Sequence, residues 1–246
     1  MKNKLRNIKL LLEYDGTAFA GWQVQPEQRT VQGVLEPALS RMTGEKVSLL
    51  GSGRTDAGVH ASGQVANFRT ETDIPLKAFC LGLNAIIPDD VAVLKTEEAD
   101  PGFNSRFDAR SRSYRYQIIT RRSPLNERFA WAITYPIDQN ILPGLCQIIL
   151  GRHDFTSFAS AQAEVNNFLV EVTMAEWTLS EGSLVFQIEA NRFLHNMVRI
   201  IVGSMIDAAR GHLKPEDLKK ILEAKDRTLA GKTAPACGLC LVKVEY

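Results

Sequence analysis

The stretch "GSGRTDAGVHASGQVANF", residues 51 to 68, places one carboxylate on a glycine-rich turn that leads into an apolar segment. Asp56 follows Arg54 and Thr55, and the segment "QVANFRT" behind it is typical of a strand. An Asp in such a turn commonly bonds to nearby backbone amides, which is the structural interpretation. An ionised Asp beside an arginine can also act as a nucleophile, because the positive charge keeps it ionised. The spacing alone leaves both interpretations open.

The glycines of this turn match neither common phosphate-binding pattern. No Lys-Ser or Lys-Thr pair closes the turn and no strong helix pattern follows it, so we expect no nucleotide cofactor. No second carboxylate lies close to Asp56 in sequence, which argues against a glycosidase-like acid pair or a two-metal cluster. We expect the glycines to permit a tight backbone path from which Asp56 projects.

The composition is that of a globular protein with one large domain or two small ones. Of 246 residues, 45% are apolar and 23% are charged. No apolar run approaches the roughly 18 residues of a membrane span. The N-terminal segment "MKNKLRNIKLLLEYDG" fits a strand better than a signal peptide, because its apolar run is short and contains Glu13. We therefore expect a cytoplasmic protein without a membrane segment.

Two of the four cysteines, Cys237 and Cys240, form the motif "CGLC". One such pair cannot complete a four-ligand zinc site, and no histidine lies nearby in sequence. A redox motif would normally open a helix, whereas "GLCLVKVEY" has the pattern of a strand. We expect reduced thiols and no metal, which agrees with the cytoplasm.

An arginine-rich run, "RFDARSRSYRYQIITRR", covers residues 106 to 122. The formal net charge of the chain is only +1, so the distribution of charge is more informative than its total. The run holds one acid, Asp108, and the aromatic residues Tyr114 and Tyr116. Arginines interleaved with aromatic rings suit phosphates and stacked bases. A solvated edge strand is the structural alternative. The arginines are Arg106, Arg110, Arg112, Arg115, Arg121 and Arg122.

The segment "NRFLHNMVRIIVGSMIDAARG", residues 191 to 211, predicts a helix that ends at Gly211. On such a helix His195 and Arg199 share a face, because they are four residues apart. A cation amid "MVRII" is expected to be partly buried and to need a counter-charge. Arg199 is therefore either one half of a structural ion pair or part of a site.

The remaining pattern predicts an α+β fold. Thr30 is expected to cap a helix that Gly44 ends, with a kink at Pro37. The order strand, helix, strand, strand, helix, strand recurs approximately in both halves of the chain. It favours two subdomains, residues 1–108 and 109–246, each with an antiparallel sheet and helices on one face. No flexible linker separates the halves, which allows them to share a continuous sheet.

With these residues in view, the chain resembles the tRNA pseudouridine synthases of the TruA family along its whole length. The resemblance rests on "EYDGTAFAGWQVQ", "GRTDAGVHASGQVANF", "FDARSRSYRYQI", "GRHDFTSF", "FLHNMVRIIVGSM" and "AKDRTLAGKTAPACGLCLVKVEY", in this order. Two departures are visible, since Asn196 replaces a common His and Ile200 a common Asn. The resemblance implies the pseudouridine synthase fold, with two α/β subdomains whose antiparallel or mixed sheets join into one extended central sheet flanked by helices.

The resemblance also implies an activity and a set of roles. The activity is isomerisation of uridine to pseudouridine at positions 38, 39 and 40 of the tRNA anticodon stem-loop, by a homodimer without cofactor or metal. It makes Asp56 the catalytic carboxylate and Arg54 the side chain that enters where the base departs. Tyr114 covers the uracil, Arg199 pairs with Asp56, and Leu241 forms an apolar wall.

Other cations become candidates for phosphate contacts, and one alternative function stays open. The candidates are Arg106, Arg110, Arg112, Arg121 and Arg122, together with Lys2, Lys4 and Arg6. The alternative is a non-catalytic RNA-binding protein of the same fold, which would not need a carboxylate facing phosphates.

Overall fold

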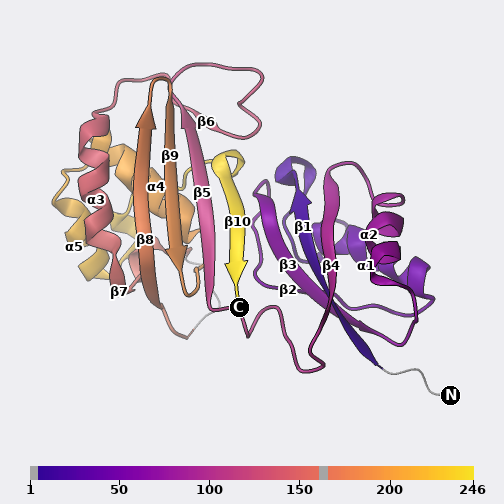
Figure 1. The fold of residues 1–246 in the computed structure, drawn as a ribbon. Coiled ribbons are helices and arrows are strands. Elements are labelled where there is room, and N and C mark those ends of the chain that lie inside the picture. Colours follow the sequence, from indigo (N-terminus) through magenta and orange to yellow (C-terminus); the bar gives the residue numbers. More distant parts are fainter. Residues whose placement is uncertain (1–4, 161–165) are drawn as a thin grey trace. The chain divides into compact units, whose positions relative to one another are not determined.

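The computed structural model describes residues 5–160 and 166–246 (Figure 1). The backbone divides into two compact units. The first runs up to Arg110 and also takes in Leu241–Tyr246, and the second covers Ser111–Cys240. Each unit combines strands with helices, so the predicted α+β class is confirmed. The functional division at residues 108 and 109 stays a prediction.

The first unit has the element order that the sequence predicted for each half. Its strands follow the order β4-β1-β3-β10, β2 also pairs with β3, and β1 is antiparallel to both β3 and β4. Only residues 241–245 of β10 belong to this unit. The elements are β1 (Arg6–Tyr14), α1 (Val31–Thr43), β2 (Leu50–Gly51), β3 (His60–Thr70), α2 (Leu76–Asn84), β4 (Val91–Ala99) and β10 (Leu239–Glu245).

Local sequence signals determine the two ends of α1, whereas packing against the sheet holds α2. The Thr30 side chain accepts the N–H of Gly33, and the helix ends at its C-cap Gly44, so both predicted ends of α1 are confirmed. Phe79 of α2 meets Phe68 of β3 edge to face, with ring centroids 5.5 Å apart. This contact holds α2 against the sheet of the first unit.

The second unit carries a mixed sheet. Its strands follow the order β5-β9-β8-β7 with antiparallel neighbours, and β6 adds to β5 in parallel. A hairpin turn at Glu181 and Gly182 joins β8 to β9. The elements are β5 (Ser111–Ile119), β6 (Trp131–Ala132), α3 (Leu142–Ile149), β7 (Gly151–Asp154), β8 (Leu169–Ser180), β9 (Ser183–Ala190), α4 (Met197–Ala209) and α5 (Asp217–Ala224).

Helix α4 is the central helix of this unit, and all but one of its residues are buried. Trp177 of β8 donates its indole N–H to the sulfur of Met205 at 3.3 Å, which joins the sheet to α4. Along β9 buried and half-buried residues alternate, so one face of this strand forms the core. None of the helices in residues 5–160 and 166–246 is long and apolar enough to cross a bilayer.

Two apolar segments have the pattern of strands but form little of one. Of "VSLL", residues 47 to 50, only Leu50 belongs to β2, and of "FAWAITY", residues 129 to 135, only the two residues of β6 are in a strand. Val47, Leu49, Ala130 and Ile133 are buried next to these short strands. The apolar pattern thus identified buried residues correctly. It did not identify strands, because a residue can be buried without belonging to a hydrogen-bonded strand.

Gly203 provides a test of packing in the second unit. It lies inside α4, and a Cβ atom there would overlap the backbone carbonyl oxygen of Lys232. We expect Gly203→Ala to lower the free energy of unfolding by about 3 kcal/mol, measured by urea denaturation. Gly144 in α3 has open space around it and serves as the control. Gly144→Ala should instead stabilise by about 0.5–1 kcal/mol, and equal midpoints for the two variants would contradict this packing.

Candidate active site

Asp56 lies on the turn between β2 and β3, and backbone contacts hold that turn from both sides. The Asp56 carbonyl accepts the N–H of Val59 at 3.1 Å, which closes the turn. The carbonyl of its neighbour Thr55 accepts the N–H of Trp22 at 3.0 Å, from the long loop after β1. The backbone at Gly16, in the loop after β1, lies directly against the backbone at Val59. A Cβ atom on Gly16 would overlap the Val59 carbonyl. The position of Asp56 is therefore fixed by a distant part of the chain.

Buried polar side chains support the same turn. Gln64 of β3 is fully buried; it donates to the Gly53 carbonyl at 2.9 Å and accepts from the Ser52 hydroxyl at 2.7 Å. The hydroxyls of Tyr14 and Thr55 lie 2.8 Å apart. Each of these groups is hydrogen-bonded, as buried polar groups need to be. Sequence reasoning did not assign these roles, although polar residues inside apolar strands were the available signal.

Apart from the candidates for phosphate contacts, the first unit carries three of the predicted site residues. Arg54 and Asp56 share the turn, where the arginine is exposed and the acid half-buried. Leu241 lies on β10 and is fully buried. An acid on a turn with a fixed backbone, beside an exposed guanidinium, suits a reaction on an anionic polymer. The cation attracts phosphates, and the fixed backbone limits the positions that the carboxylate can take.

Tyr114 lies in the second unit, on β5, opposite Ile188 of β9. Only 8% of the tyrosine is exposed. Its ring meets that of Phe193 edge to face, with centroids 5.0 Å apart and an interplanar angle of 86°. The aromatic contact fixes the plane of the Tyr114 ring, and a fixed ring can stack on a base without first losing side-chain freedom.

Arg199 also lies in the second unit, near the beginning of α4, and two hydrogen bonds hold its guanidinium. Nε donates to the carbonyl of Ala234 at 2.8 Å, and Nη1 donates to Oδ1 of Asn196 at 2.8 Å. The backbone N–H of Ala234 returns a bond to the Arg199 carbonyl at 3.0 Å. The arginine therefore joins α4 to the segment that precedes β10.

The predicted helical face shared by His195 and Arg199 is wrong, because α4 begins only at Met197. Asn196 has a φ of 62°, in the left-handed region, so the helix cannot extend back through it. The His195 carbonyl accepts the N–H of Ser160 at 2.9 Å instead of a helical bond. Residues 191 to 196, which the apolar pattern assigned to the helix, are instead held by tertiary contacts.

The arginine-rich run is divided between the two units. Arg106 and Arg110 belong to the first; Arg112, Arg121 and Arg122 belong to the second. All but Arg112 are exposed, and Arg112 is half-buried. Arg112 donates to the Asn191 carbonyl at 2.9 Å, and Arg122 lies 3.7 Å from a carboxylate oxygen of Glu127.

Tyr116 does not serve as an interleaved aromatic of that run. It is fully buried, and its hydroxyl donates to the carbonyl of Pro235 at 2.7 Å. Burial raises the pKa of this phenol far above its usual range. The alternation of "SYRY" placed both tyrosines on one face of β5, and that face is buried.

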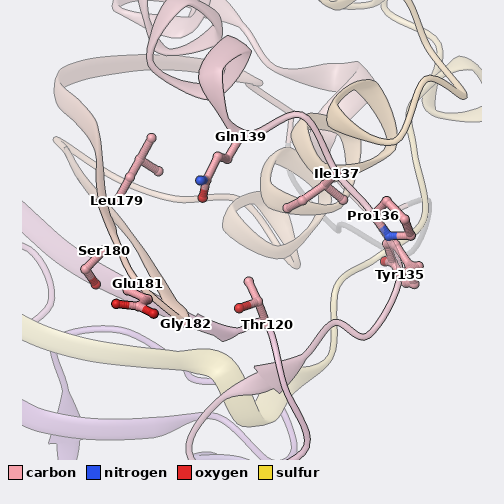
Figure 2. A pocket seen from close by; sticks show the side chains of 9 residues that line it. All are labelled: Thr120, Tyr135, Pro136, Ile137, Gln139, Leu179, Ser180, Glu181 and Gly182. Atoms are coloured by element: carbon pink, nitrogen blue, oxygen red, sulfur yellow. The ribbon is translucent and has the colours of Figure 1, made fainter.

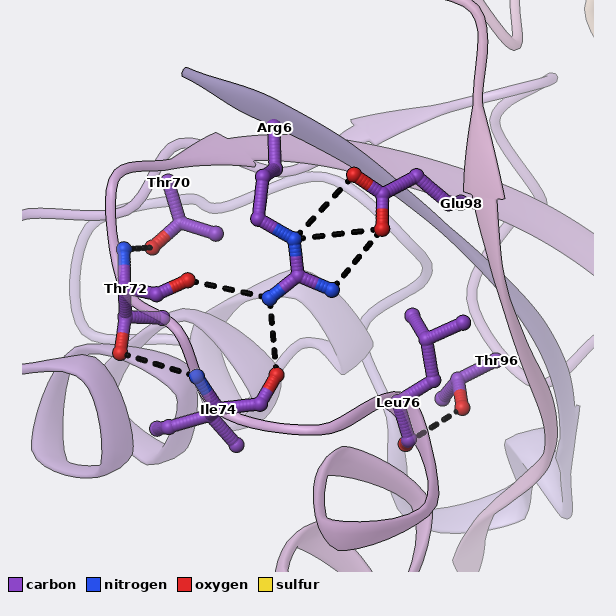
Figure 3. Close-up of polar contacts among 7 residues, drawn as sticks. All are labelled: Arg6, Thr70, Thr72, Ile74, Leu76, Thr96 and Glu98. Carbon is purple, nitrogen blue, oxygen red and sulfur yellow. Dashed lines mark hydrogen bonds and ion pairs between the residues drawn. The ribbon is translucent and has the colours of Figure 1, made fainter. Parts of the chain in front are cut away.

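Arg6 was a candidate for a phosphate contact, and the structure assigns it a structural role instead. Figure 3 shows its guanidinium bound to both carboxylate oxygens of Glu98 and to the carbonyls of Thr72 and Ile74. These bonds use most of its donors and tie β1 to the segment before α2. Lys2 and Lys4, the other candidates near it, lie outside the described residues.

The cysteines of the "CGLC" motif lie at the start of β10 and just before it. Cys237 is a free thiol whose sulfur lies 3.6 Å from the Ala130 carbonyl, and burial raises its pKa. Within the described ranges, no group of three or more histidines, cysteines or acids is placed to hold a metal ion.

A separate pocket of about 600 Å³ lies within the second unit. Figure 2 shows it between the end of β5, the β8–β9 hairpin and the segment that leads into α3. Thr120, Gln139 and Ser180 provide polar groups to its wall, and Glu181 is the one charged residue among the described side chains that line it. No cation lines the pocket among the described residues to attract a polyanion, and none of the predicted site residues contributes to it.

Comparison with known proteins identifies a family model and relatives that match most of the chain. A model of the family described as tRNA pseudouridine synthase matches residues 11–108 and 145–246. The chain is 44% identical over 244 residues to tRNA pseudouridine synthase A of Caldicellulosiruptor bescii, covering 98% of this chain and 100% of that protein. It is 46% identical over 245 residues to the protein of the same name from Pelobacter propionicus, with the same two coverages.

Solved structures give a much weaker likeness. A chain from a Cbf5-Nop10-Gar1 complex aligns with 11% identity and a TM-score of 0.37. The alignment covers 99% of this chain and 58% of that one. The assignment to a family therefore depends on sequence and on the family model.

Proposed function

The chain belongs to the tRNA pseudouridine synthase family, and from this membership we propose that it modifies positions 38, 39 and 40 of the anticodon stem-loop with Asp56 as the catalytic carboxylate. As a member of this family it is an isomerase that converts uridine in tRNA to pseudouridine. The braced turn that presents Asp56 beside Arg54 is the observation that carries the catalytic assignment.

The chemistry requires few groups. The bond between C1′ of the ribose and N1 of uracil breaks, the base turns, and a bond forms between C1′ and C5. The proton on C5 leaves once the new bond has formed and N1 takes up a proton, so the reaction is a net isomerisation that needs no oxidant or reductant. A carboxylate and a closed pocket can serve it. Three routes for Asp56 stay open: attack on C1′, attack on C6, or removal of the 2′ proton to give a glycal.

The other roles follow from the cost of reaching the base. A uridine in a stem is stacked, and turning it out costs a few kcal/mol. Arg54 is proposed to occupy the space that the base leaves, which its exposure on the turn permits. Arg199 is proposed as the counter-charge that keeps Asp56 ionised, and Leu241 as an apolar surface for the uracil.

Tyr114 is proposed to cover the detached uracil, and its variants separate the ring from the hydroxyl. We expect Tyr114→Phe to keep most of the affinity for tRNA, because the phenyl ring still stacks. Tyr114→Ala should bind about 10-fold more weakly, since one stacked base contributes on the order of 1–3 kcal/mol. Filter binding of a tRNA transcript measures both. Equal losses in the two variants would mean that the hydroxyl, and not the ring, makes the contact.

Partners and compartment complete the proposal. Arg106, Arg110, Arg112, Arg121 and Arg122 are proposed to contact tRNA phosphates, which makes binding fall as salt rises. We propose a homodimer on the basis of the family resemblance. We also propose a cytoplasmic location, since the reduced thiols of Cys80, Cys146 and Cys237 fit a reducing compartment.

Release of tritium from tRNA labelled at C5 of uridine tests the activity directly, because forming the bond to C1′ expels that hydrogen. The proposed enzyme releases tritium without any added nucleotide or metal. A protein that only binds RNA would retain the label while shifting tRNA in a gel.

A further inference from the structure

We propose that Phe107 is a stacking contact for an unpaired base of the tRNA substrate, presented with Arg106 on a turn that the first unit holds rigid. This inference rests on the proposed function, since it places a further substrate contact beside the turn of Asp56. Neither composition nor spacing singled out Phe107.

Phe107 is unusually exposed for an aromatic side chain. Its exposed fraction is 77%, whereas the next most exposed aromatic residue in the described ranges, Phe129, reaches 50%. Single exposed apolar residues are common on protein surfaces, so exposure alone implies nothing. The construction of the turn beneath the ring distinguishes Phe107 from such residues.

The turn is closed by side chains of its own residues. Oδ1 of Asn104 accepts the backbone N–H groups of Arg106 and Phe107 at 2.9 and 3.2 Å. Oδ2 of Asp108 accepts the N–H of Asn104 at 2.8 Å, and the Asp108 N–H donates to the Asn104 carbonyl at 3.0 Å. One oxygen of the Asp108 carboxylate is thereby bound to the backbone of the turn.

Ser105 anchors the turn to the sheet. It is fully buried; its N–H donates to Oδ1 of Asn67 on β3 at 2.9 Å, and its hydroxyl donates to the Leu50 carbonyl on β2 at 2.6 Å. The Tyr246 hydroxyl donates to the Ser105 carbonyl at 2.9 Å. A second buried amide, Asn7 of β1, accepts from the side chain of Asn67 at 2.8 Å.

This network fixes the backbone below an exposed ring and cation. Buried amides and hydroxyls lower stability unless they are fully hydrogen-bonded, and apolar packing would serve a purely structural turn. The guanidinium carbon of Arg106 lies 5.5 Å from the centre of the Phe107 ring. An aromatic ring on a fixed backbone, with an adjacent cation, is a combination that single-stranded nucleic acid binds, by base stacking and phosphate contact.

The location of the turn indicates which nucleic acid is bound. Through Leu50 it contacts β2, the strand that leads through Gly51 and Gly53 to Arg54 and Asp56. A base stacked on Phe107 therefore belongs to the same RNA that reaches Asp56. RNA is favoured over a second copy of this chain, because Arg106 and Arg110 are both exposed on this stretch.

The experiment measures binding of an unmodified tRNA transcript to wild type, Phe107→Ala, Phe107→Trp and Leu81→Ala. Leu81, 61% exposed on α2 of the same unit, is the matched apolar control. We expect Phe107→Ala to raise Kd about 10-fold and the Leu81 variant to stay within about 2-fold of wild type. Phe107→Trp should bind like wild type, and its added indole fluorescence should be quenched by the transcript.

Two further measurements distinguish failure of this inference from failure of the proposed function. Sedimentation of each variant reports the oligomeric state, and tritium release by wild type reports the proposed activity. A Kd for Phe107→Ala within 2-fold of wild type overturns the inference, as does a loss of self-association in that variant, which would assign the ring to a protein interface. Absence of tritium release by wild type would overturn the proposed function instead, whatever the Phe107 variants bind.

Discussion

Asp56→Asn is expected to fold and to bind tRNA within a few-fold of wild type, yet to lose turnover by about 10⁴-fold or more. The amide has nearly the same size as the carboxylate, so the backbone bonds of Asp56 and Thr55 that hold the turn stay in place. It carries no negative charge, however, and can neither attack the nucleoside nor take its proton. Single-turnover tritium release measures the loss, and a gel shift measures the binding.

Asp89→Asn is the matched control for that variant. Asp89 is an exposed acid of the same unit, outside the Asp56 turn, so its change of charge should leave turnover near wild type. A large loss of tRNA binding in Asp56→Asn would mean a structural role for the acid. Comparable turnover in the two variants would remove Asp56 from the reaction.

Arg199→Leu is expected to show the second-largest effect, a loss of turnover of about 10³-fold together with reduced stability. Leucine removes the donors to the Ala234 carbonyl and to the Asn196 side chain, and leaving a buried carbonyl without a donor costs about 1–3 kcal/mol. If Arg199 also pairs with Asp56, the carboxylate loses its orientation, and turnover falls by more than the loss of stability explains. Single-turnover tritium release measures the turnover, and urea denaturation measures the stability.

Arg199→Lys and Arg210→Leu separate these causes. Lysine keeps the charge but not the planar pair of donors, so it should recover part of the turnover and little of the stability. The guanidinium carbon of Arg210, just beyond the C-terminal end of α4, lies 4.2 Å from the centre of the Tyr135 ring, and its loss should affect stability while turnover of the folded protein stays near wild type. Turnover near wild type in Arg199→Leu would exclude Arg199 from the site.

The sequence predicted elements whose determinants are local. Helix α1 is an example, because Thr30 and Gly44 are adjacent to the ends that they set. The beginning of α4 could not be found in this way. Its left-handed Asn196 accepts a bond from Arg199, and the preceding carbonyl is bound by Ser160, which is 35 residues earlier in the chain.

In the candidate site, too, only the features with local determinants could be predicted from the sequence. Its residue types and spacing on the 51–68 stretch singled out Asp56, and the resemblance supplied its role. The support of the turn by Trp22 and by buried Gln64 depends on contacts between separate elements. Tyr116 was grouped with the aromatic residues that could contact bases, but it is buried. The alternation of a strand does not show which of its faces is buried until the partner elements are placed.

Carbodiimide mapping of pseudouridine tests the central claim most directly. Transfer RNA from a strain that lacks this gene is incubated with the wild-type protein or with Asp56→Asn, and reverse-transcription stops are then compared. Wild type should introduce stops at positions 38, 39 and 40, and Asp56→Asn should introduce none. Stops confined to other positions, or the same stops with the asparagine variant, would contradict the proposed site and its catalytic acid.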